Sequence, residues 1–333
     1  MDTKNSSLNW VAKLGKYQFF GYFVLSQVVL VLAFFVFVEV FERSLPAPRI
    51  SPSESFNEKA RWLHNLGNKK CDVLVIGSSM ALNNIDWVSI NPVLKNKSVV
   101  NTASWNMPIS KSGTMLKYIA PICKPDLIVL VAFFGDFNVK ENQPIDWEFF
   151  QQYLGSLNTG LAYLKSADLA YYTSTFVSLR IRANKGNSIY ESLNFDETGS
   201  VILDCDHFQK SRSRWDGYDR YSSLMDKKEV QIELDGLLEI ENIARANRSR
   251  LVVISTPLRK AAEEKIANTW ATALWSDVAK SVQASGGLFV QAGLLADFPD
   301  SDFADFAHLN KCGATKVAEL IAPTIIKVLV PPP

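Results

Sequence analysis

Five short runs rich in apolar residues constrain the fold of this chain most strongly. They cover residues 73–76, 98–100, 126–132, 251–255 and 288–290. Apart from Ser98, Asp126 and Ser255 at their ends, the runs are continuously apolar, which is typical of parallel strands covered by helices on both faces. Helical patterns alternate with the later runs, at about residues 113–122, 230–246, 259–284 and 314–328. The chain is therefore expected to form an α/β fold, a three-layer doubly wound sandwich with a mostly parallel five-stranded sheet.

A long interval, residues 139–228, interrupts this alternation because it contains no pattern of a buried strand. Its first part is aromatic and amphipathic, and its second part is polar and rich in turn residues. We expect a mixed insertion, partly helical and partly loop, that packs over the carboxyl edge of the sheet and shapes substrate access. Pro323 falls inside the last helical pattern, where we expect a kink or an early end of the helix.

One stretch near the N-terminus, residues 19–38, contains no charged residue. At about 1.5 Å per residue, a helix of this length crosses the roughly 30 Å hydrocarbon core of a membrane. The basic residues that precede it predict an N-terminus inside and the rest of the chain outside. A cleavable signal peptide is the alternative, but the run is long and no small-residue cleavage site follows it. We predict an uncleaved anchor at residues 17–41, after a cytoplasmic tail at residues 1–16.

A linker and a short helix, residues 42–70, separate this anchor from the predicted α/β domain of residues 71–333. The linker is rich in proline. Ser55 and Glu58 match a capping box at the start of the helix, and Gly67 is expected to end it. His64 lies in this helix with no acid–base partner nearby in sequence, so we interpret it as a surface or packing residue.

A Gly-Ser-Ser turn at residues 77–79 carries the strongest candidate for chemistry. It stands just past the carboxyl end of a predicted parallel strand, where open α/β sheets collect their ligands. Ser79 is a candidate nucleophile if a histidine takes its proton, and otherwise it belongs to an ordinary turn. Near the other end of the chain, Asp305 and His308 are spaced so that the carboxylate can hold Nδ1 while Nε2 faces the serine. We predict Ser79, His308 and Asp305 as catalytic residues.

Metal and nucleic-acid sites are not predicted. The segment 204–207 reads Asp-Cys-Asp-His, but no second cluster completes a metal site, so we interpret it as a solvated loop. The formal net charge is +1 and there is no basic run, which argues against nucleic-acid binding. We expect no metal and no cofactor.

The turn at residues 77–79 and the Asp-x-x-His motif resemble the first and last blocks of the SGNH (GDSL-type) hydrolase superfamily. The resemblance covers about residues 72–328, apart from the insertion. It implies that Ser79 is the nucleophile and that its backbone N–H helps to bind the oxyanion. It also implies that His308 is the base and that Asp305 orients the imidazole.

The two middle blocks depart from that family. The second block normally continues from its Asn to two glycines, and here Asn101 is followed by Ala103 and Asn106. The third block normally ends in Gly-x-Asn-Asp, and here Gly135 stands where the Asn is expected, with Asn138 close by. Asn106, Gly135 and Asn138 are the candidate oxyanion donors in addition to the N–H of the nucleophile. Loss of one such donor typically costs about 2.7–4 kcal/mol of transition-state stabilisation.

An anchor followed by such a domain is similar to the membrane-anchored SGNH proteins that act with membrane-bound O-acyltransferases (MBOAT proteins). The resemblance implies a single-pass protein of the bacterial inner membrane with its domain on the periplasmic or extracellular side. It implies an O-acyltransferase or acylesterase that transfers an acyl group, usually acetyl, to a hydroxyl of an exported polysaccharide or cell-wall glycan. The alternative is a non-catalytic scaffold or glycan-binding partner of a membrane acyltransferase.

The chain has four cysteines, and an oxidising compartment permits disulfides. Cys71 and Cys123 stand just before strands that neighbour each other in this family's usual strand order. Both strand starts lie at the same edge of the sheet, so we predict a disulfide between the two residues. Cys205 is able to reach Cys312 only if the insertion folds back toward the last block.

Overall fold

The computed structural model describes residues 4–329, apart from residues 68–69, 96, 140–143, 156–157, 189–191, 206–226 and 267–269. Its centre is a five-stranded sheet in which every neighbouring pair of strands is parallel, in the order β2-β1-β3-β4-β5. The strands are β1 Val73–Gly77, β2 Val99–Asn101, β3 Leu127–Ala132, β4 Arg250–Ser255 and β5 Leu288–Gln291. The predicted α/β fold with a five-stranded parallel sheet is confirmed.

The strand order and the hand of the crossovers place the helices on both faces of the sheet. The connections that contain α4 (Ile109–Cys123), α10 (Lys227–Ala246) and α12 (Trp270–Ala284) all step in the same direction along it. Right-handed crossovers therefore put these three helices on one face. The step from β1 to β2 runs the other way, so its connection, which begins with α3 (Ser79–Asn83), covers the opposite face.

The last helix, α13 (Lys311–Leu329), lies on that second face beside the connection from β1 to β2. The Asp86 N–H of this connection donates to the Ala314 carbonyl of α13 at 3.3 Å. It continues past Pro323, so the helix does not end early there, and the alternative of a kink stays a prediction. Proline removes one backbone donor, and its neighbours in this helix are buried, so packing outweighs the lost bond. The predicted helix of residues 259–284 is two helices, α11 (Lys260–Ile266) and α12.

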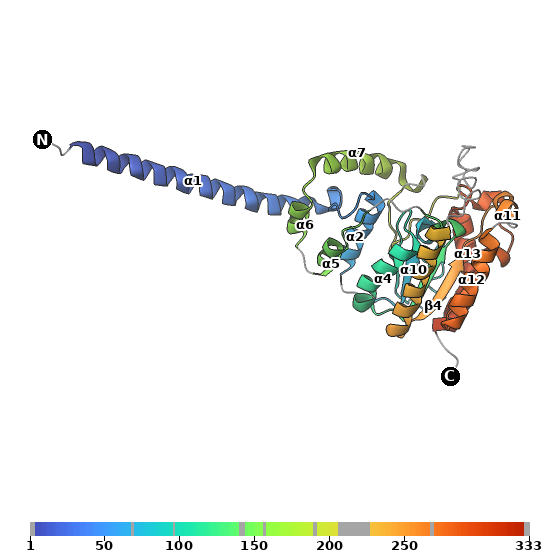
Figure 1. Ribbon diagram of the computed structural model, residues 1–333. Helices are drawn as coiled ribbons and strands as arrows, with labels where there is room; N and C mark the ends of the chain where they lie inside the picture. The colour runs from blue at the N-terminus through green and yellow to red at the C-terminus, as the bar shows by residue number, and fades with distance from the viewer. Residues whose placement is uncertain are drawn as a thin grey trace.

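The N-terminal helix, α1 (Lys4–Phe41), extends away from the α/β domain (Figure 1). Its segment Tyr17–Phe41 is long and apolar enough to cross a membrane. A short 3-10 turn, η1 (Glu42–Ser44), follows it, and then α2 (Glu54–Leu66) ends at Gly67 as predicted.

The predicted cap of α2 is wrong by two residues. Ser53 is the N-cap, and its hydroxyl accepts from the Phe56 N–H. The Ser55 hydroxyl instead accepts from the Trp105 N–H. Glu58 accepts from the Ala47 N–H and pairs with Arg61, so its carboxylate is used in tertiary contacts.

The described part of the insertion is helical at first and irregular later. It contains α5 (Trp147–Gly155), α6 (Thr159–Lys165), α7 (Leu169–Lys185) and the 3-10 turn η3 (Gly186–Ser188). Here α5 packs on α2 and α6 packs on α1, so these helices lie beside the linker and the anchor. The later segment, residues 192–205, reaches the carboxyl edge of the sheet, where the Thr198 carbonyl accepts from the Asn101 N–H at 2.7 Å.

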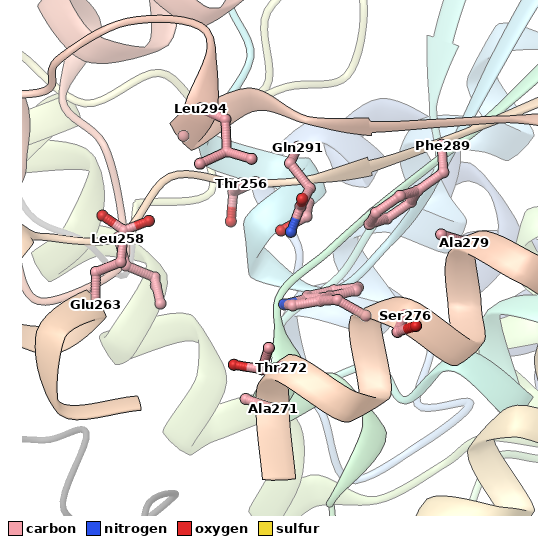
Figure 2. Close-up of a pocket in the computed structure, with 13 residues that line it drawn as sticks. Thr256, Leu258, Glu263, Ala271, Thr272, Ser276, Ala279, Phe289, Gln291 and Leu294 are labelled. Atoms are coloured by element: carbon pink, nitrogen blue, oxygen red, sulfur yellow. The ribbon is translucent and has the colours of Figure 1, made fainter. Parts of the chain in front are cut away.

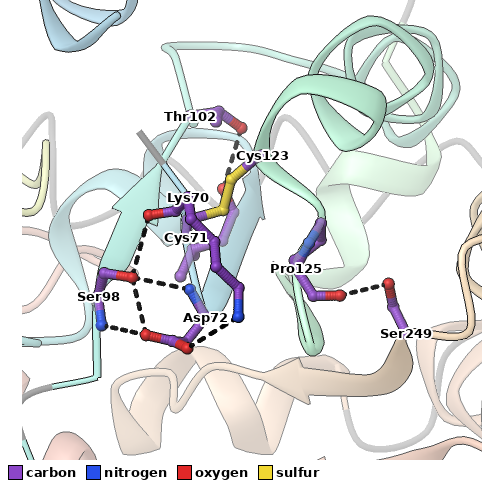
Figure 3. Close-up of a disulfide and its surroundings, with 9 residues drawn as sticks. Lys70, Cys71, Asp72, Ser98, Thr102, Cys123, Pro125 and Ser249 are labelled. Atoms are coloured by element: carbon purple, nitrogen blue, oxygen red, sulfur yellow. Dashed lines mark hydrogen bonds and ion pairs between the residues drawn. A yellow bond between two sulfur atoms is a disulfide. The ribbon is translucent and has the colours of Figure 1, made fainter. Parts of the chain in front are cut away.

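Two disulfides link distant segments of the α/β domain. The predicted Cys71–Cys123 bond is present, and its Cα atoms are 5.2 Å apart at the amino edge of the sheet (Figure 3). Beside it, the Asp72 carboxylate accepts from the N–H and the hydroxyl of Ser98. The second disulfide joins Cys205 to Cys312, so the insertion does fold back onto the start of α13. Two disulfides suggest an extracytoplasmic domain.

Candidate active site

The turn that presents Ser79 depends on Gly77, the last residue of β1. Its φ is +139°, and a Cβ there would lie 2.3 Å from the Val131 carbonyl oxygen of the neighbouring strand. Only glycine fits such a backbone, so the chain passes directly from a central strand into α3. Ser78 is the N-cap of α3, and its hydroxyl accepts from the Met80 N–H at 3.2 Å. Ser79 is thus the first residue of α3, at the carboxyl edge of the sheet.

The structure brings the three predicted catalytic residues together. The Ser79 Oγ lies 2.9 Å from His308 Nε2. The other ring nitrogen, Nδ1, lies 2.7 Å from Asp305 Oδ2. Each of the three residues is 7% exposed, so little water competes for these hydrogen bonds. This is the geometry in which an imidazole can take a proton from the serine while a carboxylate fixes its tautomer.

The second oxygen of the Asp305 carboxylate shapes the loop that carries the histidine. Asp305 Oδ1 accepts from the backbone N–H groups of Ala307 and His308, at 2.9 and 2.8 Å. The Ala304 N–H donates to the His308 carbonyl at 2.8 Å and closes the same turn. The spacing of three residues therefore has a local cause, because one carboxylate serves both the imidazole and the loop backbone.

Asn84, at the end of α3, connects the two halves of the site. Its amide nitrogen donates to the Ala307 carbonyl and its amide oxygen accepts from the Leu309 N–H, both at 2.9 Å. Asn84 is fully buried, so both bonds form out of contact with water. The sequence did not lead us to predict this role. The available signal was a polar residue directly after the helix that begins with the nucleophile.

Electrostatics favour a charged Asp305. Burial by itself raises the pKa of this carboxyl, but the neighbouring His308 and the hydrogen bonds to the loop outweigh it, and the pKa lies below its usual value. Asp305 is therefore an anion at neutral pH, which stabilises the imidazolium that forms when the histidine takes a proton.

A second buried carboxyl, Asp136, lies close to this site. It belongs to the 3-10 turn η2 (Phe134–Phe137), and it accepts from the Phe133 N–H at 3.0 Å and bonds the Ser78 side chain. Burial raises its pKa to about 7 in spite of these hydrogen bonds. Sequence reasoning did not single out this acid.

The candidate oxyanion donors lie on three separate segments of the chain. The Ser79 N–H is at the first position of α3, where backbone donors have no acceptor within the helix. Gly135 is buried in η2, directly after the strand next to β1, and its carbonyl accepts from the Asn138 N–H at 3.1 Å. Asn106 is exposed on the turn before α4, with a φ of +51°. Their roles at the oxyanion stay predictions.

Asn101, the other residue retained from the second block, has a structural role. Its amide donates to the Ala81 carbonyl at 2.7 Å and to the Ser200 hydroxyl at 3.0 Å. Its oxygen accepts from the Ala103 N–H. Asn101 therefore ties the end of β2 to the helix of the nucleophile and to the insertion.

The remaining candidates do not join the site. His64 stacks on Tyr153 and its Nδ1 lies 2.6 Å from the Tyr153 carbonyl oxygen, which fits the predicted packing role. Within the described residues, no cluster of His, Cys, Asp and Glu is suited to hold a metal ion. Asp204 is exposed, whereas Asp206 and His207 of the same predicted loop lie outside the described residues.

Fold and site together define the class of the protein as an α/β domain on a five-stranded parallel sheet, with a buried Ser-His-Asp hydrogen-bond chain at its carboxyl edge. One apolar helix, a signal or an anchor, precedes the domain. In comparisons with known proteins, no protein-family model matches the chain and no curated protein matches it significantly.

Proposed function

We propose that this protein is an extracytoplasmic O-acyltransferase or acylesterase of the SGNH type that uses Ser79 as its nucleophile. The observation that carries the proposal is the continuous chain of hydrogen bonds from Ser79 through His308 to Asp305. The three residues lie at the carboxyl edge of a parallel sheet, with the serine at a strand-to-helix turn. Such an arrangement supports nucleophilic catalysis on an ester carbonyl.

In the first half of the proposed reaction, the Ser79 oxygen attacks the carbonyl carbon of an acyl ester. His308 Nε2 takes the hydroxyl proton as the new C–O bond forms. The negative charge moves to the carbonyl oxygen, for which the Ser79 N–H is the first candidate donor. Collapse of this intermediate breaks the bond to the leaving oxygen, which receives the proton from His308. Ser79 then carries the acyl group as an ester.

In the second half, a hydroxyl group attacks the acyl–serine ester. His308 accepts the proton of that hydroxyl and returns it to Ser79 when the serine leaves. A glycan hydroxyl gives transfer and water gives hydrolysis, and the atoms balance in both cases. Asp305 stays ionised throughout, because its role is to orient the imidazole and to stabilise its positive form.

The N-terminal helix and the two disulfides support a location outside the cytoplasm. We propose that residues 17–41 anchor the protein in the bacterial inner membrane with the N-terminus inside. The close approach of Gly160 in α6 to Phe35 supports a domain held next to the membrane. In this position the domain would receive an acyl group, usually acetyl, through a multispanning MBOAT protein and pass it to an exported polysaccharide or cell-wall glycan.

A fluorophosphonate probe tests whether Ser79 is activated. The full-length protein in detergent should be labelled, and Ser79→Ala should abolish labelling. Ser112→Ala is a matched control, because Ser112 is also buried but lies on α4. Labelling that persists in Ser79→Ala would contradict the proposal. In a second assay, acetyl that moves from a model donor to a sugar indicates a transferase, and release to water alone indicates an esterase.

The second candidate function is a non-catalytic scaffold or glycan-binding partner of a membrane acyltransferase. It is favoured by Gly135 and Asn106, which stand where the SGNH family has an Asn and a Gly that serve the oxyanion. A folded wild-type protein that the probe does not label would support this function over the enzyme.

A further inference from the structure

A cavity of about 520 Å³ opens at the carboxyl ends of β4 and β5, beside α12 (Figure 2). Its volume lies within the range of small-molecule sites in proteins. Ser255 and Thr256 line it from the end of β4, and Gln291 lines it from the end of β5. Trp275 lines it from α12. The cavity thus occupies the same edge of the sheet as Ser79.

One wall of the cavity is an aromatic surface that its neighbours hold in place. The Trp275 indole stacks on Phe289, with ring centroids 5.6 Å apart and an interplanar angle of 29°. Phe137 contacts the same indole edge-on at 5.7 Å. An indole that is fixed on two sides keeps its orientation without a ligand, so a ligand loses little binding free energy in ordering it.

The polar groups of the cavity are mostly neutral. Figure 2 shows the hydroxyl of Thr256 and the amide of Gln291 directed toward the space that the lining residues surround. Among the described residues that line the cavity there is no Lys, Arg or His, and Glu263 is the one carboxylate. A lining of this kind disfavours an anionic ligand and suits hydroxyl groups, which can both donate and accept.

Thr256 marks the point at which a ligand hydroxyl fits. The residue is 4% exposed, and its hydroxyl has no hydrogen-bond partner within the described part of the chain. Its backbone N–H is already used, because it donates to the Ala132 carbonyl at 3.1 Å. A buried hydroxyl without a partner destabilises the protein, and a ligand that supplies one would remove that cost.

The cavity and the candidate active site lie along the same edge of the sheet. In the sheet, β3 alone separates β1 from β4. Neighbouring strands are about 4.8 Å apart, so the ends of β1 and β4 are roughly 10 Å apart. Leu258 lines the cavity, and the next residue, Arg259, donates its N–H to the carbonyl of Phe306 in the loop of His308.

We infer that this cavity is a subsite for an uncharged sugar residue of the acceptor glycan. The assignment of a glycan rests on the proposed acyl transfer, whereas the lack of charge on the sugar rests on the lining of the cavity. The ring stacks on Trp275, and its hydroxyl groups bond Thr256 and Gln291. A neighbouring sugar of the same chain then reaches Ser79. The described lining disfavours an anionic sugar such as a uronate, because Glu263 would repel it and no described lining residue is a cation that would pair with it.

Calorimetric titration of the full-length protein in nanodiscs tests this inference. The probes are tetrasaccharides of glucose, mannose, galactose and N-acetylglucosamine, with tetragalacturonate as the anionic comparison. We expect at least one neutral tetrasaccharide to bind, and the uronate to bind at least about tenfold more weakly. Thr256→Val keeps the shape of the side chain and should weaken binding roughly three- to tenfold, the effect of one neutral hydrogen bond. Thr173→Val, on the exposed part of α7, is the matched control and should leave binding unchanged.

Three outcomes would overturn the inference: no neutral tetrasaccharide binds, the uronate binds equally well, or Thr256→Val has the affinity of the wild type. Ser79→Ala should still bind sugar, because Ser79 does not line the cavity. Fluorophosphonate labelling of the same samples separates this test from that of the proposed function. Labelling without sugar binding refutes the subsite alone, and sugar binding without labelling refutes the enzyme alone.

Discussion

Asp136→Asn should stabilise the protein at and above neutral pH and have little effect near pH 4. The Asp136 carboxyl is 3% exposed, and burial raises its pKa from 3.8 to about 7. The folded protein therefore keeps a proton on this group over a range in which the unfolded chain has released it. An asparagine can accept from the Phe133 N–H in the same way, and its amide can donate to Ser78, but it cannot ionise.

The size of the effect follows from proton linkage. The folded pKa is the higher one, so the contribution of the proton to stability is complete below about pH 4 and is lost as the pH rises to about 7. A difference of about three pKa units corresponds to roughly 4 kcal/mol in the free energy of unfolding. The advantage of Asp136→Asn should therefore grow from near zero at pH 4 to a few kcal/mol at pH 8, with relaxation of the structure making it smaller.

Urea unfolding of both proteins in mild detergent, at intervals from pH 4 to pH 8, measures this difference directly. Other titrating groups are common to both chains and cancel. Asp235→Asn, an exposed carboxylate on α10, is the control and should show a small difference that does not grow with pH. The reasoning is refuted if Asp136→Asn differs from the wild type by a constant amount across this range.

Three further changes test the architecture. Cys71→Ala with Cys123→Ala opens a loop of 52 residues, and chain entropy predicts a loss of about 4 kcal/mol in unfolding free energy, measured by urea unfolding against the oxidised wild type, in which this disulfide is intact. Gly77→Ala should lower the free energy of unfolding by about 1–3 kcal/mol, because alanine is strained at the positive φ of this position. We expect a lower melting temperature and reduced labelling by the fluorophosphonate probe. Unchanged stability would contradict the turn geometry. Asp305→Asn should lower the rate of acyl transfer or hydrolysis by about 10⁴-fold while the chain stays folded, and a loss under tenfold would argue against its role.

The strands were predictable because their signal is local. In β1 and β3 every residue is buried, so each run is apolar from end to end and stands out against its surroundings. The N-cap of α2 was less predictable, since two nearby serines offered similar local patterns. Tertiary contacts decided between them, because Ser55 is buried against the turn that contains Trp105.

The insertion was the least predictable region. Its aromatic residues indicate a packed segment but do not say which surface it packs on. The structure places α5 against α2 and α6 against α1, whereas residues 192–205 reach the sheet. Lys59 shows why the packing of the insertion could not be predicted from the sequence. Its ammonium group is buried, and it donates to the carbonyls of Asn101 and Gly199, a contact that joins α2, β2 and the insertion across distant parts of the chain.

By itself, the sequence determined the fold class, the apolar N-terminal helix and the residue types available for catalysis, because hydrophobic patterns and short motifs act within a few residues. Only the tertiary structure decided that Ser79 and His308, 229 residues apart, lie within hydrogen-bond distance. It also decided that Asn84 joins their loops and that Cys205 meets Cys312. These contacts depend on strand order and on which side chains the folded chain buries together, and neither is encoded in local spacing.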